Sequence, residues 1–310
     1  MRIRRMKYGL PYKGSKNRLA ERILSILPNK EHFFDLFCGG CAVSHAALLR
    51  RKFKTIHIND INWMCPELFV AALEGKYVNE KRWISREDFY KLKDTDPYVA
   101  IVWSFGNNMR DYLYSREREP LKRAIHYALV FDDYGPGLEL GYDFSFLKEI
   151  KGNQPRYRAI KTHFFSRDGE LQSFEQNEKL VRLQSLERCV HLSYFPFSCG
   201  RTELSYSSVD YADVAIPKDS VIYCDIPYKG TNVYNTTEEF DYERFYRWCA
   251  EQQQPVFISS YVLPADQFLC VAEWEHQCIF SASSYKVVKE RLFIPIHQEP
   301  PQLITQGCLF

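Results

Sequence analysis

The stretch SVIYCDIPYKGTNVY, residues 220–234, contains residue types that could form a functional site. Its apolar run is typical of a buried strand, and the run ends on Asp225, Ile226, Pro227 and Tyr228. Asp and Pro are also common in turns, and Tyr228 could simply cover the end of the strand. Because short motifs match by chance, other parts of the chain have to decide between a site and a turn.

Acidic residues also stand at the ends of two further apolar segments. In DLFCGG, residues 35–40, paired glycines let the backbone turn sharply and approach a ligand, while Asp35 can bind a cationic or hydroxyl group. A simple turn with an incidental carboxylate is the alternative, and the dinucleotide-binding pattern G-x-G-x-x-G is absent. In IHIND, residues 56–60, Asp60 follows the glycine turn by about 20 residues, which suits a ribose diol. Asp60 could also cap the next helix, and both roles can hold together.

The segment PYKGSKNRLAERIL, residues 11–24, places Gly14 and Lys16 before an amphipathic helix. It resembles a truncated phosphate-binding loop, but G-x-x-x-x-G-K-[ST] is missing, so binding of a nucleoside triphosphate is not expected. Lys16 could contact a carboxylate instead, or lie in solvent. Cys38 and Cys41 form a C-x-x-C pair without a second pair or a His cluster. The sequence therefore predicts no metal site, and a redox dithiol is the weaker alternative.

The 310-residue chain has the composition of an ordinary soluble globular protein, with 45% hydrophobic and 26% charged residues. No apolar run approaches the roughly 20 residues of a membrane span, and the basic start MRIRRMK lacks the apolar segment of a secretory signal. Ten scattered cysteines predict reduced thiols and a cytoplasmic protein. Because the net charge is +2, any nucleic-acid surface has to come from local basic clusters.

Apolar runs and turn signals predict an α/β fold with a parallel, doubly wound sheet. Strands are expected at residues 33–37, 53–60, 220–225 and 255–261, helices at 42–51, 61–75 and 238–252, and a terminal antiparallel hairpin from 269–280 and 284–296. Between about residues 76 and 189 the chain is charged, aromatic and rich in loops, which favours a mostly helical insertion. An amphipathic helix at 177–189 should lead into a strand-like segment, 190–195.

Taken in order, these segments resemble one family, the Dam-type adenine-N6 DNA methyltransferases, and especially its phage-like branch. PYKGSK is similar to that family's N-terminal cofactor motif, FFDLFCGGCAVS to its first nucleotide-fold motif, INDIN to its acidic motif, and VIYCDIPYKGT to its catalytic D-P-P-Y motif. WSFGNN, YLYS, EPLKRAIHYALVF and RLQSLER resemble the intervening recognition region, while FISSY and VVKERLFI resemble the final strands. The matches follow the family's order over nearly the whole chain.

The resemblance implies a Rossmann-like S-adenosylmethionine-dependent methyltransferase fold in two parts, residues 1–102 and 190–310, separated by a target-recognition insertion at 103–189. It implies a cytoplasmic enzyme of a prokaryotic or phage-infected cell that methylates adenine N6 in double-stranded DNA. The catalytic residues would be Asp225, Ile226, Pro227 and Tyr228. The cofactor residues would be Tyr12, Lys16, Asp35, Phe37, Gly39, Asp60, Asp210 and Asp225. Asn107, Asn108, Arg110, Arg116 and Arg118 would contact DNA, the asparagines at a base edge and the arginines at phosphates.

In this family's chemistry Asp225 and the carbonyl of Ile226 would accept hydrogen bonds from the adenine amine, while Tyr228 would stack on a base rotated out of the duplex. The usual second residue of the motif is proline, so Ile226 retains the carbonyl and loses a backbone restraint. Two alternatives stay open: a cytosine-N4 methyltransferase, whose relatives usually carry Ser at position 225, and a DNA-binding subunit with weakened catalysis. A solvated charged helix is the alternative for the basic cluster. The sequence does not identify the recognition site, the oligomeric state or a partner restriction nuclease.

Overall fold

The computed structural model describes residues 8–12, 14–77, 79–165, 202–228, 240–281 and 284–301. The chain forms two compact units, which are described here one at a time. The first, which we call the sheet unit, combines Met1–Glu74 with Phe195–Phe310, and the second, the helical unit, is Gly75–Tyr194. The domain boundaries drawn from the sequence, after residues 102 and 189, stay predictions.

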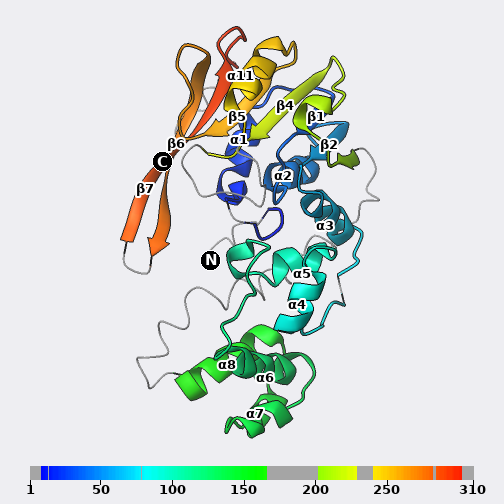
Figure 1. Ribbon diagram of the computed structural model, residues 1–310, viewed down its shortest axis with the longest axis vertical. Coiled ribbons are helices and arrows are strands. Elements are labelled where there is room, and N and C mark those ends of the chain that lie inside the picture. The colour runs from blue at the N-terminus through cyan, green and yellow to red at the C-terminus, as the bar shows by residue number, and fades with distance from the viewer. Residues whose placement is uncertain are drawn as a thin grey trace. The chain divides into compact units, whose positions relative to one another are not determined.

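The sheet unit is built on seven strands in the order β3-β2-β1-β4-β5-β7-β6 (Figure 1). Neighbours from β3 to β5 are parallel, whereas β7 is antiparallel to both β5 and β6. The strand bounds are β1 His32–Asp35, β2 Thr55–Asn59, β3 Glu203–Ser207, β4 Ser220–Asp225, β5 Val256–Ser260, β6 Phe268–Ser281 and β7 Ser284–Pro295. This arrangement confirms the predicted α/β, Rossmann-like class.

Both faces of the central strands carry apolar side chains, as expected where a parallel sheet is covered by helices on two sides. In β4, Ile222 and Cys224 belong to a buried cluster with Phe245 of helix α11, Tyr242–Glu251. In β1 the alternation sends Phe34 to that cluster, while Phe33 stacks on Phe53 with ring centroids 5.1 Å apart. The sheet is therefore held from both faces.

Turns bring the chain from each strand into the next helix of the sheet unit. After β1, Cys41 N donates to Cys38 O at 2.6 Å, which closes a tight turn before α2 begins. Asp241 accepts a hydrogen bond from Arg244 N and so caps the start of α11. The remaining helices of this unit are the 3-10 turns η1 Lys16–Arg18 and η5 Tyr211–Asp213 and the α-helices α1 Ala20–Ile26, α2 Ala42–Arg50 and α3 Met64–Leu73.

The strands expected from apolar runs are present as β1, β2, β4 and β5, and the terminal hairpin is confirmed as β6 and β7. The edge strand β3 was missed, because its pattern ELSYS is largely exposed and gives no apolar signal. The helix and strand expected at residues 177–195 lie outside the described residues. Cysteines 38, 41, 65, 224 and 249 are free and buried, and Cys270 is free and exposed.

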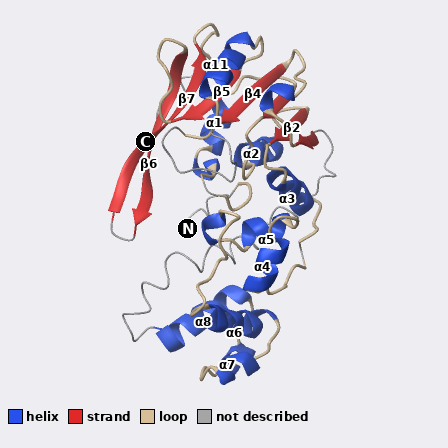
Figure 2. Cartoon of the chain, viewed as in Figure 1, coloured by secondary structure: helices blue, strands red, loops and turns tan. Residues whose placement is uncertain are grey.

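The described part of the helical unit consists of helices and loops, as Figure 2 shows by colour. One isolated bridge joins Ser104 to Tyr112, and no strand is assigned between residues 79 and 165. Its elements are α4 Arg86–Leu92, α5 Pro97–Val102, η2 Phe105–Asn107, α6 Glu119–Val130, α7 Gly135–Glu139, η3 Ser145–Glu149 and α8 Asn153–Phe165. Ala124, Ala128, Phe144, Leu147 and Ile160 form the core between α6, η3 and α8.

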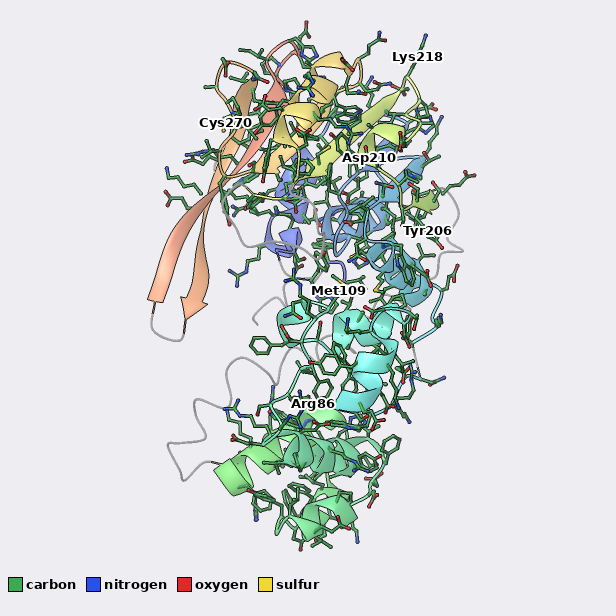
Figure 3. All side chains as sticks on the ribbon, in the orientation of Figure 1. Arg86, Met109, Tyr206, Asp210, Lys218 and Cys270 are labelled. Atoms are coloured by element: carbon green, nitrogen blue, oxygen red, sulfur yellow. The ribbon has the colours of Figure 1, made fainter. Side chains whose placement is uncertain are left out.

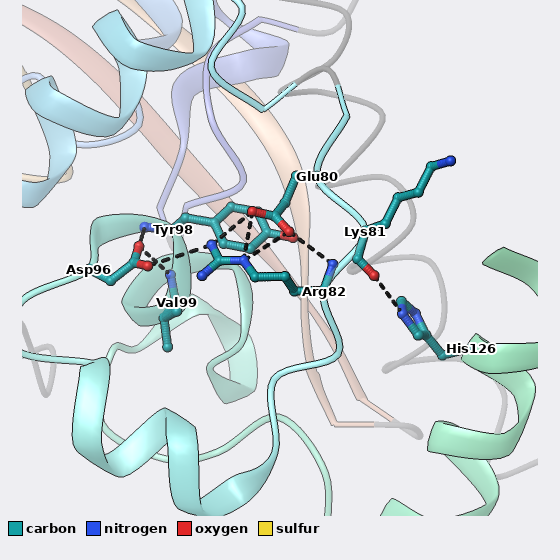
Figure 4. A network of polar contacts seen from close by, with 7 residues as sticks. All are labelled: Glu80, Lys81, Arg82, Asp96, Tyr98, Val99 and His126. Carbon is teal, nitrogen blue, oxygen red and sulfur yellow. Dashed lines mark hydrogen bonds and ion pairs between the residues drawn. The ribbon is translucent and has the colours of Figure 1, made fainter. Parts of the chain in front are cut away.

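A network of polar contacts joins the extended segment before α4 to two helices (Figure 4). Arg82 pairs with Glu80 at 2.7 Å and with Asp96 at 3.6 Å, and its guanidinium lies 5.6 Å from the centroid of the Tyr98 ring. His126 of α6 contacts the carbonyl oxygen of the adjoining Lys81 at 2.9 Å.

Throughout the described residues, every helix is too short or too polar to cross a membrane.

Candidate active site

Three carboxylates stand at the carboxyl ends of adjacent parallel strands in the sheet unit. Asp35 ends β1, Asp225 ends β4, and Asp60 directly follows β2. β1 pairs with β2 on one side and with β4 on the other, so the strand order reverses at β1. Ligands of open α/β sheets bind outside the strand ends at such a switch point. The three residues predicted from separate motifs are therefore brought to one edge of the sheet.

Asp35 is buried and only partly satisfied. Its Oδ2 accepts a hydrogen bond from Ser44 of α2 at 2.5 Å, while Oδ1 is buried and has no hydrogen-bond partner among the described residues. Burial raises the pKa of this carboxyl group to about 7, against the lowering effect of the Ser44 hydrogen bond. A buried carboxylate oxygen without a donor costs free energy, and a cationic ligand would remove that cost.

Asp60 holds two backbone groups in place. Its Oδ2 accepts from Gly39 N at 2.8 Å, and its Oδ1 accepts from Asn62 N at 2.9 Å. Burial raises the pKa of Asp60 to about 6, although both backbone hydrogen bonds lower it. Asp60 thus links the glycine turn after β1 to the start of the segment that leads into α3. It organises the loop, and the cofactor role predicted for Asp60 and Gly39 stays a prediction.

Close backbone contacts shape the glycine turn. Leu10 N donates to Gly40 O at 2.7 Å, so the N-terminal segment runs directly beside the turn. Gly9 has φ +68°, and a Cβ there would lie 2.2 Å from Gly40 O. The ring of Tyr12 covers the turn, because a Cβ on Gly39 would lie 3.0 Å from its Cε1 atom. Glycine at position 39 lets the Tyr12 ring lie against the turn, and glycine at position 9 lets the N-terminal segment approach Gly40.

Asp225 is held by a buried lysine from the opposite end of the sequence. Lys16 Nζ lies 2.7 Å from Oδ1 and 2.7 Å from Oδ2 of Asp225. The side chain of Lys16 is 8% exposed, whereas that of Asp225 is 21% exposed. Burial raises the pKa of Asp225 to about 6, with Lys16 lowering it. For Lys16, burial lowers the pKa, but nearby carboxylates raise it above its ordinary value, so the ammonium stays charged.

Tyr228 and a glutamate complete this cluster. Tyr228 OH contacts Asp225 Oδ1 at 3.3 Å and forms a shorter hydrogen bond to Glu290 of β7. Glu290 also lies 3.5 Å from Lys16 Nζ, and its side chain is 4% exposed. Lys16 Nζ lies 4.9 Å from the centroid of the Tyr228 ring. The four side chains therefore form one polar cluster, which we call the Lys16 cluster.

The two residues between Asp225 and Tyr228 have structural partners. Ile226 is 2% exposed and belongs to the buried core cluster that contains Phe245. The carbonyl oxygen of Pro227 accepts a hydrogen bond from Tyr242 OH at 3.0 Å. The loop directly after β4 is thus anchored by packing at Ile226 and by this hydrogen bond. The residues that follow, 229–239, lie outside the described part of the chain.

Phe37 and Asp210 belong to an aromatic region beside the strand ends. Phe37 packs against Tyr211 with ring centroids 5.4 Å apart and against Phe240 at 5.7 Å. Asp210, labelled in Figure 3, caps η5 and accepts two hydrogen bonds from Arg244, both at 2.8 Å. This ion pair lowers the pKa of Asp210, with the Arg244 hydrogen bonds as the largest cause. The cofactor contacts predicted for Phe37 and Asp210 stay predictions.

The asparagines expected to read DNA are engaged within the helical unit. Asn107 is 8% exposed and donates from Nδ2 to Ile101 O at 2.9 Å, with φ +57°. Asn108 Oδ1 accepts from Arg110 N at 2.9 Å in a local turn. Base reading by Asn107 would require its side chain to leave the Ile101 contact, and this role stays a prediction.

The predicted phosphate contacts are more accessible. Arg110 and Arg116 are exposed, and Arg118 is half-buried. Within the described residues, no group of three or more His, Cys, Asp or Glu side chains is arranged to hold a metal ion.

Sequence reasoning missed Glu290 and Ser44 as members of the site. A glutamate in a charged, alternating strand usually faces solvent, so the sequence around Glu290 did not indicate that its side chain is buried in the site. The alternation of the strand could have indicated its burial, because Glu290 lies on the same face of β7 as Leu292 and Ile294, which are both buried. Ser44 follows Asp35 by nine residues and reaches it only because the turn reverses the chain.

Comparison with known proteins gives one family. The model of a family described as D12 class N6 adenine-specific DNA methyltransferase matches residues 12–128. The matched segment contains Tyr12, Lys16, Asp35 and Asp60, and Asp225 lies beyond it. No curated protein matches the chain.

Proposed function

We propose that Asp225 is the residue that binds the reacting adenine amine, because residues 12–128 match the model of the D12 class N6 adenine-specific DNA methyltransferases. The family methylates adenine N6 in DNA, which favours adenine over the alternative of cytosine N4. The observation that carries the proposal is a carboxylate at the end of β4, at the switch point of the sheet, with a pKa raised to about 6 by burial.

We propose S-adenosylmethionine as the methyl donor, and the residues at the strand ends fit its charges. When bound, this cofactor supplies an activated methyl group on a sulfonium. Asp35 Oδ1 is buried without a hydrogen-bond partner in the described part of the chain, and it could accept hydrogen bonds from the cofactor's ammonium group. Asp60, as a second buried carboxylate, would add attraction for a cation and could accept from a ribose hydroxyl. The glycine turn covered by Tyr12 offers backbone close to such a ligand.

The residues of the D-I-P-Y segment would act on the amine of the base. Adenine N6 is a weak nucleophile because its lone pair is delocalised into the ring. Asp225 and the Ile226 carbonyl would accept hydrogen bonds from the two N6 protons and direct the lone pair toward the methyl group. Bond formation from N6 to the methyl carbon would break the carbon–sulfur bond of the donor, and the Asp225 carboxylate would stabilise the positive charge that builds on nitrogen. Asp225 can then take the proton that N6 releases.

Tyr228 would provide a ring for stacking of the extruded base. Its hydroxyl is held by the Lys16 cluster, so the ring has a defined position before DNA binds. Ile226 is anchored in the core, which compensates for the proline restraint that the usual motif would supply. We propose that the helical unit contacts DNA through exposed arginines such as Arg110 and Arg116.

The proposal is tested by the variant Asp225→Ala, with Asp266→Ala as a matched control. Asp266 is exposed in the loop before β6, so its loss should leave activity unchanged. Asp225→Ala should lower kcat by at least about 100-fold, because the contact acts mainly in the transition state. Transfer of labelled methyl from the cofactor to duplex DNA measures kcat, and chromatography of digested DNA identifies the modified base. Substantial turnover in a folded Asp225→Ala variant, or methylation of cytosine, would contradict the proposal.

A further inference from the structure

Glu290 reaches the active site from the antiparallel strand β7. In the register of β5 and β7, Ser260 pairs with Arg291 and Ser259 pairs with Leu292. Because β7 runs against β5, its residue 290 arrives at the edge where the parallel strands end. The side chain is 4% exposed and contacts both Lys16 and Tyr228. A carboxylate this buried is costly to desolvate unless its partners compensate for the loss of water.

The Lys16 cluster holds two carboxylates and one cation. Lys16 is 2.7 Å from Asp225 and 3.5 Å from Glu290, so Asp225 is the nearer partner. A structural ion pair would need one carboxylate for this lysine. The second carboxylate, held within reach of the same ammonium group, gives Lys16 two alternative partners.

The proposed reaction makes a second partner useful. In the structure Lys16 contacts both oxygens of Asp225, and Tyr228 OH contacts one of them. An adenine amine would have to compete with these donors for the same oxygens. If Lys16 moved toward Glu290, the Asp225 oxygens would become accessible while the ammonium stayed paired in a buried position.

We propose that Glu290 is a positioning residue for methyl transfer, which takes over Lys16 when Asp225 binds the adenine amine and keeps Tyr228 oriented throughout. This inference rests on the proposed function of Asp225. Glu290 acts through Lys16 and Tyr228, and it does not itself touch the methyl group or the base. Its charge also opposes ionisation of Asp225, so it affects the acidity of the catalytic carboxylate.

Several titratable groups lie near Asp225 on the elements around it, and the pH dependence has to be read against all of them. They are Lys16, Glu290, Tyr228, Tyr223, Asp35 and Asp60. A change confined to Glu290 leaves the other groups in place, so the difference between variant and parent isolates its effect.

The variant Glu290→Gln keeps the shape of the side chain and removes its charge. We expect kcat at saturating cofactor to fall about tenfold at its pH plateau, which corresponds to about one pKa unit of interaction. Cofactor affinity should change less than about twofold, since Glu290 has no predicted contact with it. Glu273→Gln is the matched control: Glu273 lies on β6 of the same hairpin, its side chain is 36% exposed, and it pairs with Lys289 and Arg291. That variant should retain the parental kcat.

The pH profile distinguishes positioning from a general loss of structure. Removing the Glu290 charge should lower the pKa of Asp225, so the acid limb of kcat shifts to lower pH while the plateau falls. A merely destabilised enzyme would lose plateau activity without this shift. An unchanged limb, or a parental plateau in Glu290→Gln, would overturn the inference.

Two further measurements complete the test. In a Lys16→Met background, Glu290→Gln should lower kcat by clearly less than the original tenfold, because no lysine is left to be redirected and only the contact with Tyr228 is lost. A loss of the original size in that background would overturn the role assigned to Lys16. Titration of the Asp225 carboxyl carbon by NMR, with Asp225→Asn as the assignment control, should show the lower pKa in free Glu290→Gln. The titration needs no turnover, so it tests the inference separately from the proposed function. An inactive parent enzyme would reject the proposed function, whereas an unchanged Asp225 pKa in Glu290→Gln would reject the inference.

Discussion

Asp35 offers the sharpest quantitative prediction, because its ionisation should control cofactor binding. Burial raises its pKa to about 7, so the carboxyl is about 75% ionised at pH 7.5 and about 3% ionised at pH 5.5. If the ionised form binds the cofactor's ammonium group, the contribution of Asp35 alone should lower affinity for S-adenosylmethionine about 25-fold between these two pH values. A carboxyl with the ordinary value of 3.8 would be ionised throughout and would leave affinity nearly constant.

Asp35→Asn serves as the companion to this pH change. The variant should bind weakly at pH 7.5 and show only the smaller pH dependence that comes from Asp60, whose pKa is about 6. Isothermal calorimetry at a series of pH values measures the affinity, and circular dichroism confirms that the protein stays folded. Equal pH dependence in parent and Asp35→Asn would refute the assignment of this carboxylate to the cofactor.

Asp35→Asn should weaken cofactor binding but raise the folding stability of the protein at high pH. The folded-state pKa of Asp35 lies above its unfolded value of 3.8, so the folded state binds more protons between pH 4 and 7. Folding stability contributed by this group is therefore present at low pH and lost as pH rises through about 7. The loss is at most about 4 kcal/mol, given about 1.4 kcal/mol per pKa unit. Urea denaturation at pH 8 should show that Asp35→Asn is more stable than the parent. The gain should be smaller than the full loss in the parent, because the Asn amide also costs free energy to bury.

Three other substitutions test separate parts of the molecule. Ile226→Pro should retain activity, because the accepting carbonyl is kept, but loss of packed volume in the core should lower stability by about 1 kcal/mol in urea denaturation. A dead but folded Ile226→Pro enzyme would contradict the role of that carbonyl. Gly9→Ala should lower stability by more than about 2 kcal/mol and weaken cofactor binding, since the added methyl would collide with Gly40 O. Neutralising Arg116 and Arg118 together should reduce the slope of log affinity for DNA against log salt concentration by about 2. An unchanged slope would show that neither arginine contacts a phosphate.

The sequence predicted the central strands of the sheet, whose side chains are mostly buried. β1, β4 and β5 are short apolar runs because both faces of these strands are largely buried, and such runs are visible without knowledge of the fold. β2 alternates instead, with buried Ile56 and Ile58 each following a half-buried polar residue. The acidic residues at their ends could be predicted as neighbours, since parallel strands end at a common edge. Edge strand β3 gave no such signal, because ELSYS carries mostly exposed side chains.

What the sequence could not supply was the pairing of distant side chains. The residues around Lys16 left open whether it contacts a carboxylate or lies in solvent. Its partner is Asp225 at the end of β4, and nothing in either motif identifies the other. Glu290 looked like one charge among several in VVKERLFI. Its burial depends on the antiparallel register of β7 with β5, which short-range patterns do not determine. Nor does the sequence around Asn107 show that its amide donates to Ile101 O, although its predicted role at a base edge stays a prediction.

The placement of Glu290 on the last strand has a consequence for how the protein is made. β1 pairs with β4, which is synthesised only after the whole helical unit, and the Lys16 cluster also needs β7. At about 5–20 residues per second, tens of seconds separate the emergence of Lys16 from that of Glu290 at the ribosome. A nascent chain that has released β1 and β2 therefore exposes unpaired strand edges for that time. We expect the helical unit, with its local contacts, to fold first and the Lys16 cluster to assemble only near the end of translation.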